Sequence, residues 1–299
     1  MGSARTGLVE RGAELLDRTM AFAMENPTMM AAVIIGLLAL VAGLYLLRRF
    51  TRPRGARLLD ELKQLEEVAV LLHPNPDPDA MATGIAVASL ADQVDTDASV
   101  QYAGQVRHQE NRAFQTVLDL DIDQIDHVSD LAAEHVVLVD HNRPRGFAGA
   151  DSVLPFAVVD HHPGDGTGSA HTDVRPEYGA CATIIAEYAE DLGLVPRDAG
   201  SGDIDPERTL SADVATGLMY GILADTNHLT KGCSPAEFTA SRYLHEAVDE
   251  GLLDRIANPA VDAEVLDTKA RAIRQRELRA PFAVADVGSV SNLDAIPQA

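Results

Sequence analysis

Acidic and imidazole side chains follow four short apolar runs of the chain, directly where each run ends. They are His73 after the run 68–72, Asp140 after 135–139, Asp160, His161 and His162 after 156–159, and Asp225 after 221–224, with Asp77 and Asp79 in the loop that follows His73. Several carboxylates in one place repel one another unless a cation lies between them. Because these ligands are oxygen and imidazole without thiolate, they suit Mn²⁺, Mg²⁺, Co²⁺ or Fe²⁺ better than a structural zinc ion.

Each of these residues alone has an ordinary explanation, because an aspartate at the end of a strand often caps a helix or lies in a solvated loop. The four segments together favour a binding site, since histidine occurs at two of them. Two divalent ions about 4 Å apart could share one bridging carboxylate, activate a water molecule and hold phosphoryl oxygens. The residues therefore predict two-metal hydrolysis of a phosphate compound.

Short apolar runs that alternate with helical stretches must position these side chains. We expect strands at 68–72, 100–103, 135–139 and 156–159 and helices at 79–91, 177–192, 236–250 and 262–279, with the run 221–224 closing a helical stretch that begins near Leu210. This pattern predicts an α/β fold with a mainly parallel, doubly wound sheet. Ligands of such sheets bind outside the carboxyl ends of the strands, so the polar residues should meet at one edge. Asp79 is expected to cap the helix that starts there.

An uncharged run at residues 29–47 precedes this pattern and predicts one transmembrane helix. At 1.5 Å per residue its length just spans the roughly 30 Å hydrocarbon core of a bilayer. Five arginines follow directly, so the positive-inside rule places the N-terminus outside and the downstream chain in the cytoplasm. A buried core helix is the less favoured alternative, and a cleaved secretory signal would carry its charges before a shorter run.

The charge of the chain is unevenly distributed. The first 57 residues hold eight Arg against four acidic residues, whereas the remainder holds 16 basic and 42 acidic residues. An acidic, lysine-poor surface is typical of a protein that works in concentrated salt, because salt screens self-repulsion, so we expect a halophilic source. The same charge argues against a broad basic track for duplex nucleic acid, and two cysteines exclude a disulfide framework.

The order of the motifs resembles that of the DHH phosphoesterase superfamily. The matching residues are His73-x3-Asp77-x-Asp79, then Asp140, then Asp160-His161-His162, then Asp225 in GILADT, and the resemblance covers residues 66–285. The superfamily includes RecJ exonucleases, NrnA-type oligoribonucleases, cyclic-di-AMP phosphodiesterases and family II pyrophosphatases. The resemblance implies a cofactor of two divalent metal ions, most often Mn²⁺, with Mg²⁺ or Co²⁺ as alternatives.

The resemblance also implies a role for each site residue. One Mn²⁺ would be held by His73, Asp77 and Asp140, and the second by Asp79, Asp140, His161 and Asp225, so that Asp140 bridges the two. His162 would contact the substrate phosphate, and Asp160 would orient a histidine by a hydrogen bond, or would be a buried structural residue. Arg112, in a stretch at 108–112 that is similar to a segment of archaeal members, and Lys231 are candidate phosphate contacts or surface residues. The expected catalytic residues are Asp140, His162 and Asp160.

These features predict the organisation of the chain. We expect an amphipathic segment at 1–28, the transmembrane helix at 29–47, a basic juxtamembrane linker at 48–65, the catalytic domain at 66–260, and at 261–299 a connector helix with the start of a second domain. Family members that cleave nucleotides carry a glycine-rich GGGH motif in that second domain. The chain contains no Gly-Gly pair, so we expect the second domain to be missing or truncated.

The predicted function is Mn²⁺-dependent hydrolysis of phosphodiester bonds in a small nucleotide, either a cyclic dinucleotide or a short oligonucleotide. A RecJ-like single-strand exonuclease is the enzymatic alternative. A membrane receptor that binds a nucleotide without cleaving it is the alternative from another class. The expected partners are the nucleotide or short single-stranded substrate and the lipid bilayer, and the chain could also form a homodimer.

Overall fold

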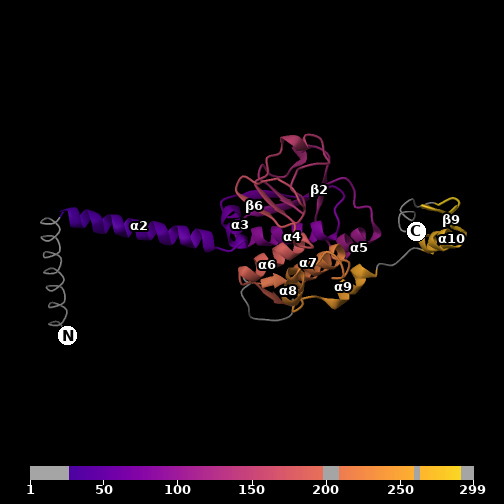
Figure 1. The fold of residues 1–299 in the computed structure, drawn as a ribbon. Helices are drawn as coiled ribbons and strands as arrows, with labels where there is room; N and C mark the ends of the chain where they lie inside the picture. Colours follow the sequence, from indigo (N-terminus) through magenta and orange to yellow (C-terminus); the bar gives the residue numbers. More distant parts are fainter. Residues whose placement is uncertain (1–26, 198–208, 259–262, 291–299) are drawn as a thin grey trace, which may run out of the picture. The chain divides into compact units, whose positions relative to one another are not determined.

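A six-stranded sheet forms the centre of the protein (Figure 1). The structure is a computed structural model, and it describes residues 27–197, 209–258 and 263–290. The strand order is β3-β2-β1-β4-β5-β6, and every neighbouring pair is parallel. The strands are β1 (Glu67–Leu72), β2 (Asp97–Ala103), β3 (Asp123–Ile125), β4 (Val136–Val139), β5 (Ala157–Asp160) and β6 (His171–Val174). The predicted α/β fold with a mainly parallel sheet is therefore confirmed.

The order of the strands reverses between β1 and β4. From β1 the chain builds β2 and β3 on one side, then returns to place β4, β5 and β6 on the other side. A reversal of this kind leaves a crevice outside the carboxyl ends of the two central strands, because the chain leaves them in opposite directions. The residues that follow β1 and β4 therefore lie at the natural ligand position of the sheet.

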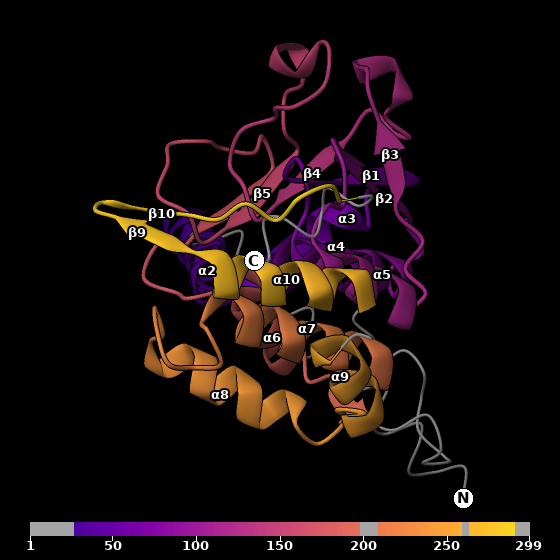
Figure 2. The same cartoon turned by 90° about the vertical axis from the view of Figure 1, so that its right-hand side faces the viewer.

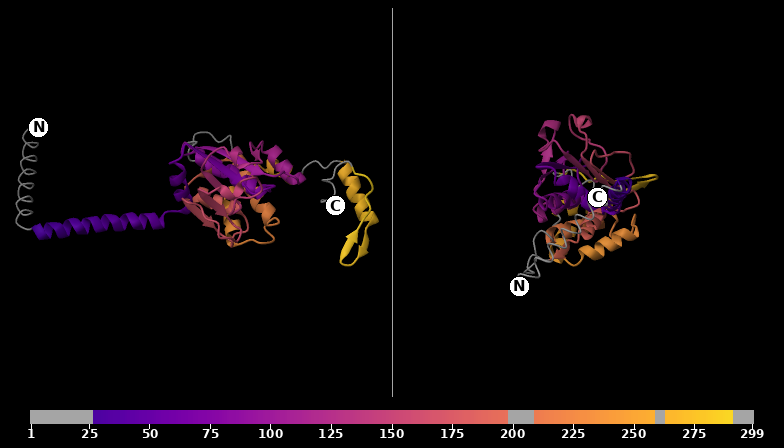
Figure 3. Two further views of the ribbon diagram at one scale, coloured as in Figure 1. Left: turned by 90° about the horizontal axis from the view of Figure 1, so that it is seen from above. Right: turned by 90° about the vertical axis from the view of Figure 1, so that its left-hand side faces the viewer.

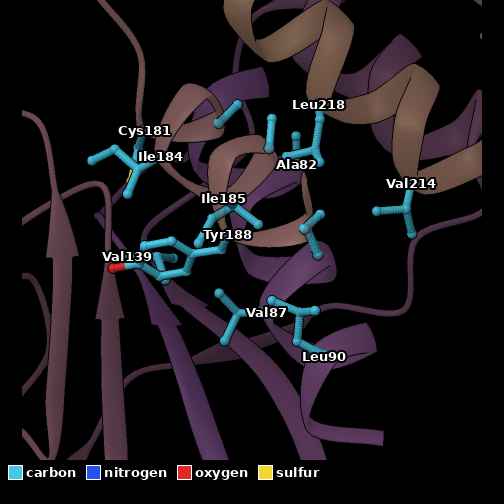
Figure 4. Packing of buried hydrophobic residues seen from close by; sticks show 14 of the residues in the cluster. Ala82, Val87, Leu90, Val139, Cys181, Ile184, Ile185, Tyr188, Val214 and Leu218 are labelled. Carbon is cyan, nitrogen blue, oxygen red and sulfur yellow. The ribbon is translucent and has the colours of Figure 1, made fainter. Parts of the chain in front are cut away.

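Helices cover one face of the sheet and bury the main hydrophobic core (Figure 2; right-hand view of Figure 3). They are α4 (Pro78–Asp92), α5 (Gln109–Val117), α6 (Cys181–Asp191), α7 (Ala212–Asp225), α8 (Pro235–Leu244) and α9 (Glu250–Ala257). Figure 4 shows Val139 of the sheet among Val87, Ile184 and Ile185 of α4 and α6. The other face carries a smaller core around Leu71 and Leu138, covered by segments with the 3-10 helices η1 (Val128–Asp130) and η2 (Ala150–Ser152).

Some boundaries differ from those expected. The predicted helix 177–192 begins at Cys181, and the predicted helix 236–250 is divided into α8 and α9 because Asp249 caps a new helix by accepting from the Leu252 amide. The predicted helix 262–279 ends earlier, as α10 (Ala263–Gln275), and the hairpin β9 (Glu277–Arg279) and β10 (Phe282–Val284) follows it. A short parallel pair, β7 (Val195–Arg197) and β8 (Thr209–Ser211), was not predicted.

Helix α2 (Pro27–Thr51) contains the predicted transmembrane run. Its window Pro27–Leu44 has a mean hydropathy of 2.2 and none of it is buried, so by length and composition this helix could cross a membrane. Its membrane location and its orientation stay predictions. Of the amphipathic segment predicted at 1–28, residues 1–26 lie outside the described residues.

The predicted linker 48–65 contains a folded helix that belongs to the domain. Helix α3 (Arg54–Leu62) lies in the compact unit that begins at Pro53, and its Leu58 and Leu62 side chains are completely buried. Leucines four residues apart place two apolar side chains on one face of a helix, which packs against α6. The arginines of this segment suggested a linker, but the leucines decide its structure.

Alanine in place of Leu58 is expected to lower the free energy of unfolding by about 2–5 kcal/mol, because the substitution leaves a cavity in the core. Urea unfolding of the full chain in detergent would measure this loss. Leu154→Ala is the matched control, since Leu154 is 86% exposed and its truncation should change stability little. An unchanged free energy of unfolding in Leu58→Ala would show that α3 is not part of the folded core.

Candidate metal centre

The predicted site residues come together at the carboxyl ends of β1, β4 and β5, next to the first turn of α4 and the last turn of α7. His73 directly follows β1, Asp140 follows β4, and His161 follows β5. Asp77 is the N-cap of α4, and Asp225 is the last residue of α7. The arrangement needs parallel strands, since only then do the ends of all three strands lie at one edge.

The first group of candidate ligands contains His73, Asp77 and Asp140. Nε2 of His73 lies 3.4 Å from Oδ2 of Asp77 and 3.3 Å from Oδ2 of Asp140. One ligand atom from each of the three residues lies within 4.8 Å of the others, which is close enough to surround a single ion.

The second group lies around Nε2 of His161. This nitrogen is 3.2 Å from Oδ1 of Asp140, 3.5 Å from Oδ2 of Asp225 and 3.8 Å from Oδ2 of Asp79. Asp140 thus directs one carboxylate oxygen to each group, which is the arrangement of a bridging ligand. The structure brings all six predicted metal ligands together, while metal binding itself stays a prediction.

Unsatisfied buried atoms indicate that a cation belongs here. Among the described residues, both carboxylate oxygens of Asp140 and Nε2 of His161 are buried without a hydrogen bond of acceptable geometry. Buried polar atoms are nearly always paired in folded proteins, so each of these atoms requires a partner. Oxygen and imidazole ligands fit a divalent ion such as Mn²⁺, and the residues present therefore fit the predicted cofactor.

The histidine rings are held by their other nitrogen. Nδ1 of His73 lies 3.0 Å from the Pro74 carbonyl oxygen, and Nδ1 of His161 lies 3.2 Å from the carbonyl oxygen of Tyr178. A carbonyl can only accept, so Nδ1 carries a proton in each ring, and Nε2 is the nitrogen that faces the carboxylates and could bind an ion. Outer hydrogen bonds of this kind orient metal-binding histidines in many proteins.

Three comparisons with known proteins bear on this geometry. The model of the DHH family, N-terminal domain, matches residues 67–222, which is more than half of the chain. The chain belongs to the DHH family. The subtype within the DHH family stays a prediction.

Relatives of this DHH protein include an uncharacterized protein of Methanocaldococcus jannaschii, 32% identical over 82% of this chain and 49% of that protein. A probable manganese-dependent inorganic pyrophosphatase of Bacillus cereus is 28% identical over 62% of this chain and 56% of that protein. The chain thus spans about half the length of the curated relatives it matches. The crystal structure of an exopolyphosphatase-related protein from Bacteroides fragilis has the same fold, with a TM-score of 0.58 and 14% identity, over 76% of this chain and 66% of that one.

The DHH motif itself forms a hydrogen-bonded unit beside the ligands. Oδ1 of Asp160 accepts from the backbone amide of His162 and lies 3.0 Å from Nδ1 of the His162 ring. Oδ2 of Asp160 accepts from the side-chain amide of Asn142 at 2.7 Å. Asp160 is fully buried, whereas the His162 side chain is 54% exposed. The predicted hydrogen bond between a histidine and Asp160 is present, with the carboxylate as acceptor and Nδ1 of His162 as donor, so Nε2 of His162 takes no part in it.

Asp79 makes contacts that the sequence did not reveal. Its oxygens accept hydrogen bonds from the amides of Cys181 at 2.7 Å and Ala182 at 2.8 Å, which form the N-terminus of α6. A carboxylate oxygen has two acceptor positions, so Asp79 can hold α6 and still bind an ion. The expected cap of α4 is instead Asp77, which accepts from the Ala80 amide, because the helix begins one residue earlier at Pro78.

Charge in the site is shared between imidazoles and carboxylates. Burial lowers the pKa of His73 and of His161, but the neighbouring carboxylates outweigh burial and raise the pKa of His73 to about 10 and that of His161 to about 11. Burial raises the pKa of Asp140, and the two histidines outweigh it and lower that pKa to about 2. Without a bound ion, the imidazoles thus carry the positive charge that the carboxylates require.

Of the three predicted substrate contacts, His162 lies beside Asp140 and His161, whereas Arg112 and Lys231 are not among the grouped candidate ligands. Arg112 is half-buried in α5, where it donates to the carbonyl of Arg107, and Lys231 is exposed in the turn that follows α7. Their contact with phosphate stays a prediction. His141 is buried, and its Nδ1 lies 2.9 Å from the Val139 carbonyl oxygen at the end of β4.

Asn111 was not predicted as a site residue, although it lies in the stretch 108–112. This buried side chain donates to the Pro76 carbonyl at 3.0 Å and thereby fixes the loop that carries His73, Asp77 and Asp79. Nothing in the residue type signals such a role, because the contact joins positions 35 residues apart.

Proposed function

We propose that this protein is a metal-dependent phosphoesterase that uses two Mn²⁺ ions to hydrolyse phosphodiester bonds of a small nucleotide. The observation that carries the proposal is the position of Asp140 between the two ligand groups, with one of its unsatisfied buried oxygens close to His73 and the other close to His161. When bound, two such ions supply an activated water and positive charge for the phosphoryl oxygens. His73 and Asp77 would hold one ion, Asp79, His161 and Asp225 the other, and Asp140 both.

His162 is proposed to bind and orient the scissile phosphate. The hydrogen bond to Asp160 raises the pKa of His162 and partial burial opposes this effect, so the ring favours the cationic form more than a free histidine does. A cationic imidazole at the rim of the site can donate a charge-assisted hydrogen bond to a phosphoryl oxygen. Asp160 fixes the ring, so its contribution is to position His162.

A phosphoanhydride is the second candidate substrate. It is favoured by the two relatives from Bacillus cereus that are named probable manganese-dependent inorganic pyrophosphatases. A DHH site can treat both substrates alike at the reacting phosphorus atom, since in each case water displaces an oxygen leaving group. The groups that contact the remainder of the substrate decide between them.

The proposal includes an attachment to the cell membrane. Residues 29–47 would cross the bilayer once, and the arginines from Arg48 onwards would hold the catalytic domain on the cytoplasmic side with the N-terminus outside. The acidic domain surface supports activity in concentrated salt. A small soluble nucleotide suits a tethered enzyme better than a long DNA end does.

A substrate panel tests the proposal. The full chain in detergent, with Mn²⁺ and at low and high salt, would be assayed on cyclic dinucleotides, short RNA, single-stranded DNA and pyrophosphate, with bis-p-nitrophenyl phosphate as a generic ester. Turnover of a cyclic dinucleotide or short RNA is expected. Preference for pyrophosphate would support the second candidate, and processive degradation of single-stranded DNA the RecJ-like alternative. Mn²⁺ binding without turnover of any substrate would identify a receptor.

A further inference from the structure

A buried cluster of charged and phenolic side chains lies beside the metal centre, between the end of β6 and helix α6. Asp173 is completely buried and Arg175 is 8% exposed. Burial of charge is costly unless every charge is paired and hydrogen-bonded, so a cluster like this is weak evidence for added stability. The role of the cluster is therefore sought in the groups that it contacts.

Arg175 organises the cluster through its whole guanidinium group. Nε and Nη2 donate to the carboxylate of Asp173, with Nη2 at 2.8 Å, while Nη1 donates to Glu187 at 2.7 Å and to the Tyr178 hydroxyl at 2.9 Å. The Tyr178 hydroxyl donates in turn to Glu187 at 2.7 Å. The guanidinium group offers five donors in a fixed planar fork, so it can pair with one carboxylate through two nitrogens and still hold two further partners.

The cluster is joined to the metal-binding histidine by short backbone contacts. The amide of Arg175 donates to the carbonyl of Asp160, the residue before His161, at 2.9 Å, and the amide of Tyr178 donates to the carbonyl of Arg175 at 3.0 Å. The carbonyl of Tyr178 then accepts from Nδ1 of His161. Both ends of the turn 175–178 are therefore fixed against the segment that carries His161.

The same cluster reaches helix α3, the first helix after α2. Arg54 at the start of α3 pairs with Asp173, and Asp173 also accepts from the Tyr188 hydroxyl at 2.6 Å. A Cβ atom on Gly55 would lie 2.7 Å from Cβ of Tyr188, so α3 lies directly on α6 at this point. A shift of α3 would therefore disturb Asp173 and, through it, Arg175.

We propose that Arg175 is a positioning residue for His161, which it aligns through the carbonyl of Tyr178, and that Arg54 extends this control to helix α3. The inference rests on the proposed metal centre. It gives the charged cluster a role other than stability, since apolar residues can often replace a buried ion pair without loss of stability. It also connects α3, the helix that follows α2, to the metal group around His161. The other metal group is not connected in this way, because His73 and Asp77 have no part in the cluster's contacts described above.

Mn²⁺ titrations of the full chain, with free Mn²⁺ followed by electron paramagnetic resonance, test the proposal. Arg175→Lys keeps the charge beside Asp173 but loses the fork, and we expect one of the two Mn²⁺ affinities to fall about tenfold, as for other outer contacts of metal-binding histidines. Tyr178→Phe removes only one of the three partners of the guanidinium group, and Arg54→Gln acts further from His161, so each should weaken the same affinity about threefold. The affinity of the other ion should not move in any variant.

Arg242→Lys is the matched control. Arg242 of α8 makes an exposed ion pair with Glu190, which lies on α6 like Glu187 and Tyr188 of the cluster. A melting curve for each variant would establish that the protein is folded during the titration. Unchanged Mn²⁺ affinities in folded Arg175→Lys and Tyr178→Phe would overturn the positioning role, and an unchanged affinity in Arg54→Gln would overturn the connection to α3. If the wild type bound no Mn²⁺, the proposed function itself would fail, so the two failures are distinguishable.

Discussion

Asparagine in place of Asp140 should lower Mn²⁺-dependent turnover by about a thousandfold or more, because metal ions supply several kcal/mol of transition-state stabilisation and each 1.36 kcal/mol is a factor of ten. Asp140 offers one carboxylate oxygen to each candidate metal group. The amide carries no charge and its nitrogen does not bind a cation, so one group loses a ligand atom and both groups lose the negative charge of the shared carboxylate. Steady-state hydrolysis of the best substrate at saturating Mn²⁺ would measure the loss.

Asparagine is the informative replacement because of the backbone at this position. Asp140 has a φ of +60°, a left-handed conformation that asparagine adopts readily and alanine does not. Loss of activity in a protein with an unchanged melting curve can then be assigned to the metal centre. Asp151→Asn, an exposed carboxylate in η2, is the matched control and should keep full activity. Full turnover in Asp140→Asn would reject the assignment of Asp140 as the bridging ligand.

The affinity for Mn²⁺ should rise by about tenfold per pH unit for each proton displaced, between about pH 6 and 9. The affinity for Mn²⁺ rises with pH, and does not fall, because the pKa values of two candidate ligands are raised. His73, with a pKa of about 10, and His161, with a pKa of about 11, each hold a proton throughout this range in the ion-free site. An incoming ion must displace that proton from Nε2, so acid competes with the metal and alkali favours it.

Calorimetric titration in two buffers with different ionisation enthalpies would count the protons released on Mn²⁺ binding. His73→Gln should release one proton fewer than the wild type, because the titrating imidazole is gone. His245→Gln, which changes an exposed histidine at the end of α8, should release the same number as the wild type. A Mn²⁺ affinity that is independent of pH, without proton release, would contradict the proposed role of these imidazoles.

The sequence was sufficient to predict the central strands and the meeting of the six ligands. Strands such as β1 and β4 are continuous apolar runs, because both faces of a parallel sheet are buried. Once these strands are parallel, the residues after them must lie at one edge. The polar ends of the runs therefore predicted the cluster without any knowledge of individual contacts.

Other features depend on contacts that no local pattern encodes. Strand β6 reads HTDV, and its Asp173 is buried only because Arg175 and Tyr188 pair with it. The bond between Asp79 and Cys181 joins positions 102 residues apart. Helix α3 was not predicted, because the arginines of this segment indicated a linker, although its buried leucines pack it against the domain.

The hold of Asp79 on the N-terminus of α6 has a consequence for biosynthesis. The chain leaves the ribosome from its N-terminus, and domains fold as units. The cluster of candidate ligands is complete only when α6 has formed against Asp79 and when Asp225, far later in the chain, has emerged. On the proposed function, a nascent polypeptide would therefore not bind both metal ions before Asp225 has emerged, and metal binding would be a late event in the maturation of the protein.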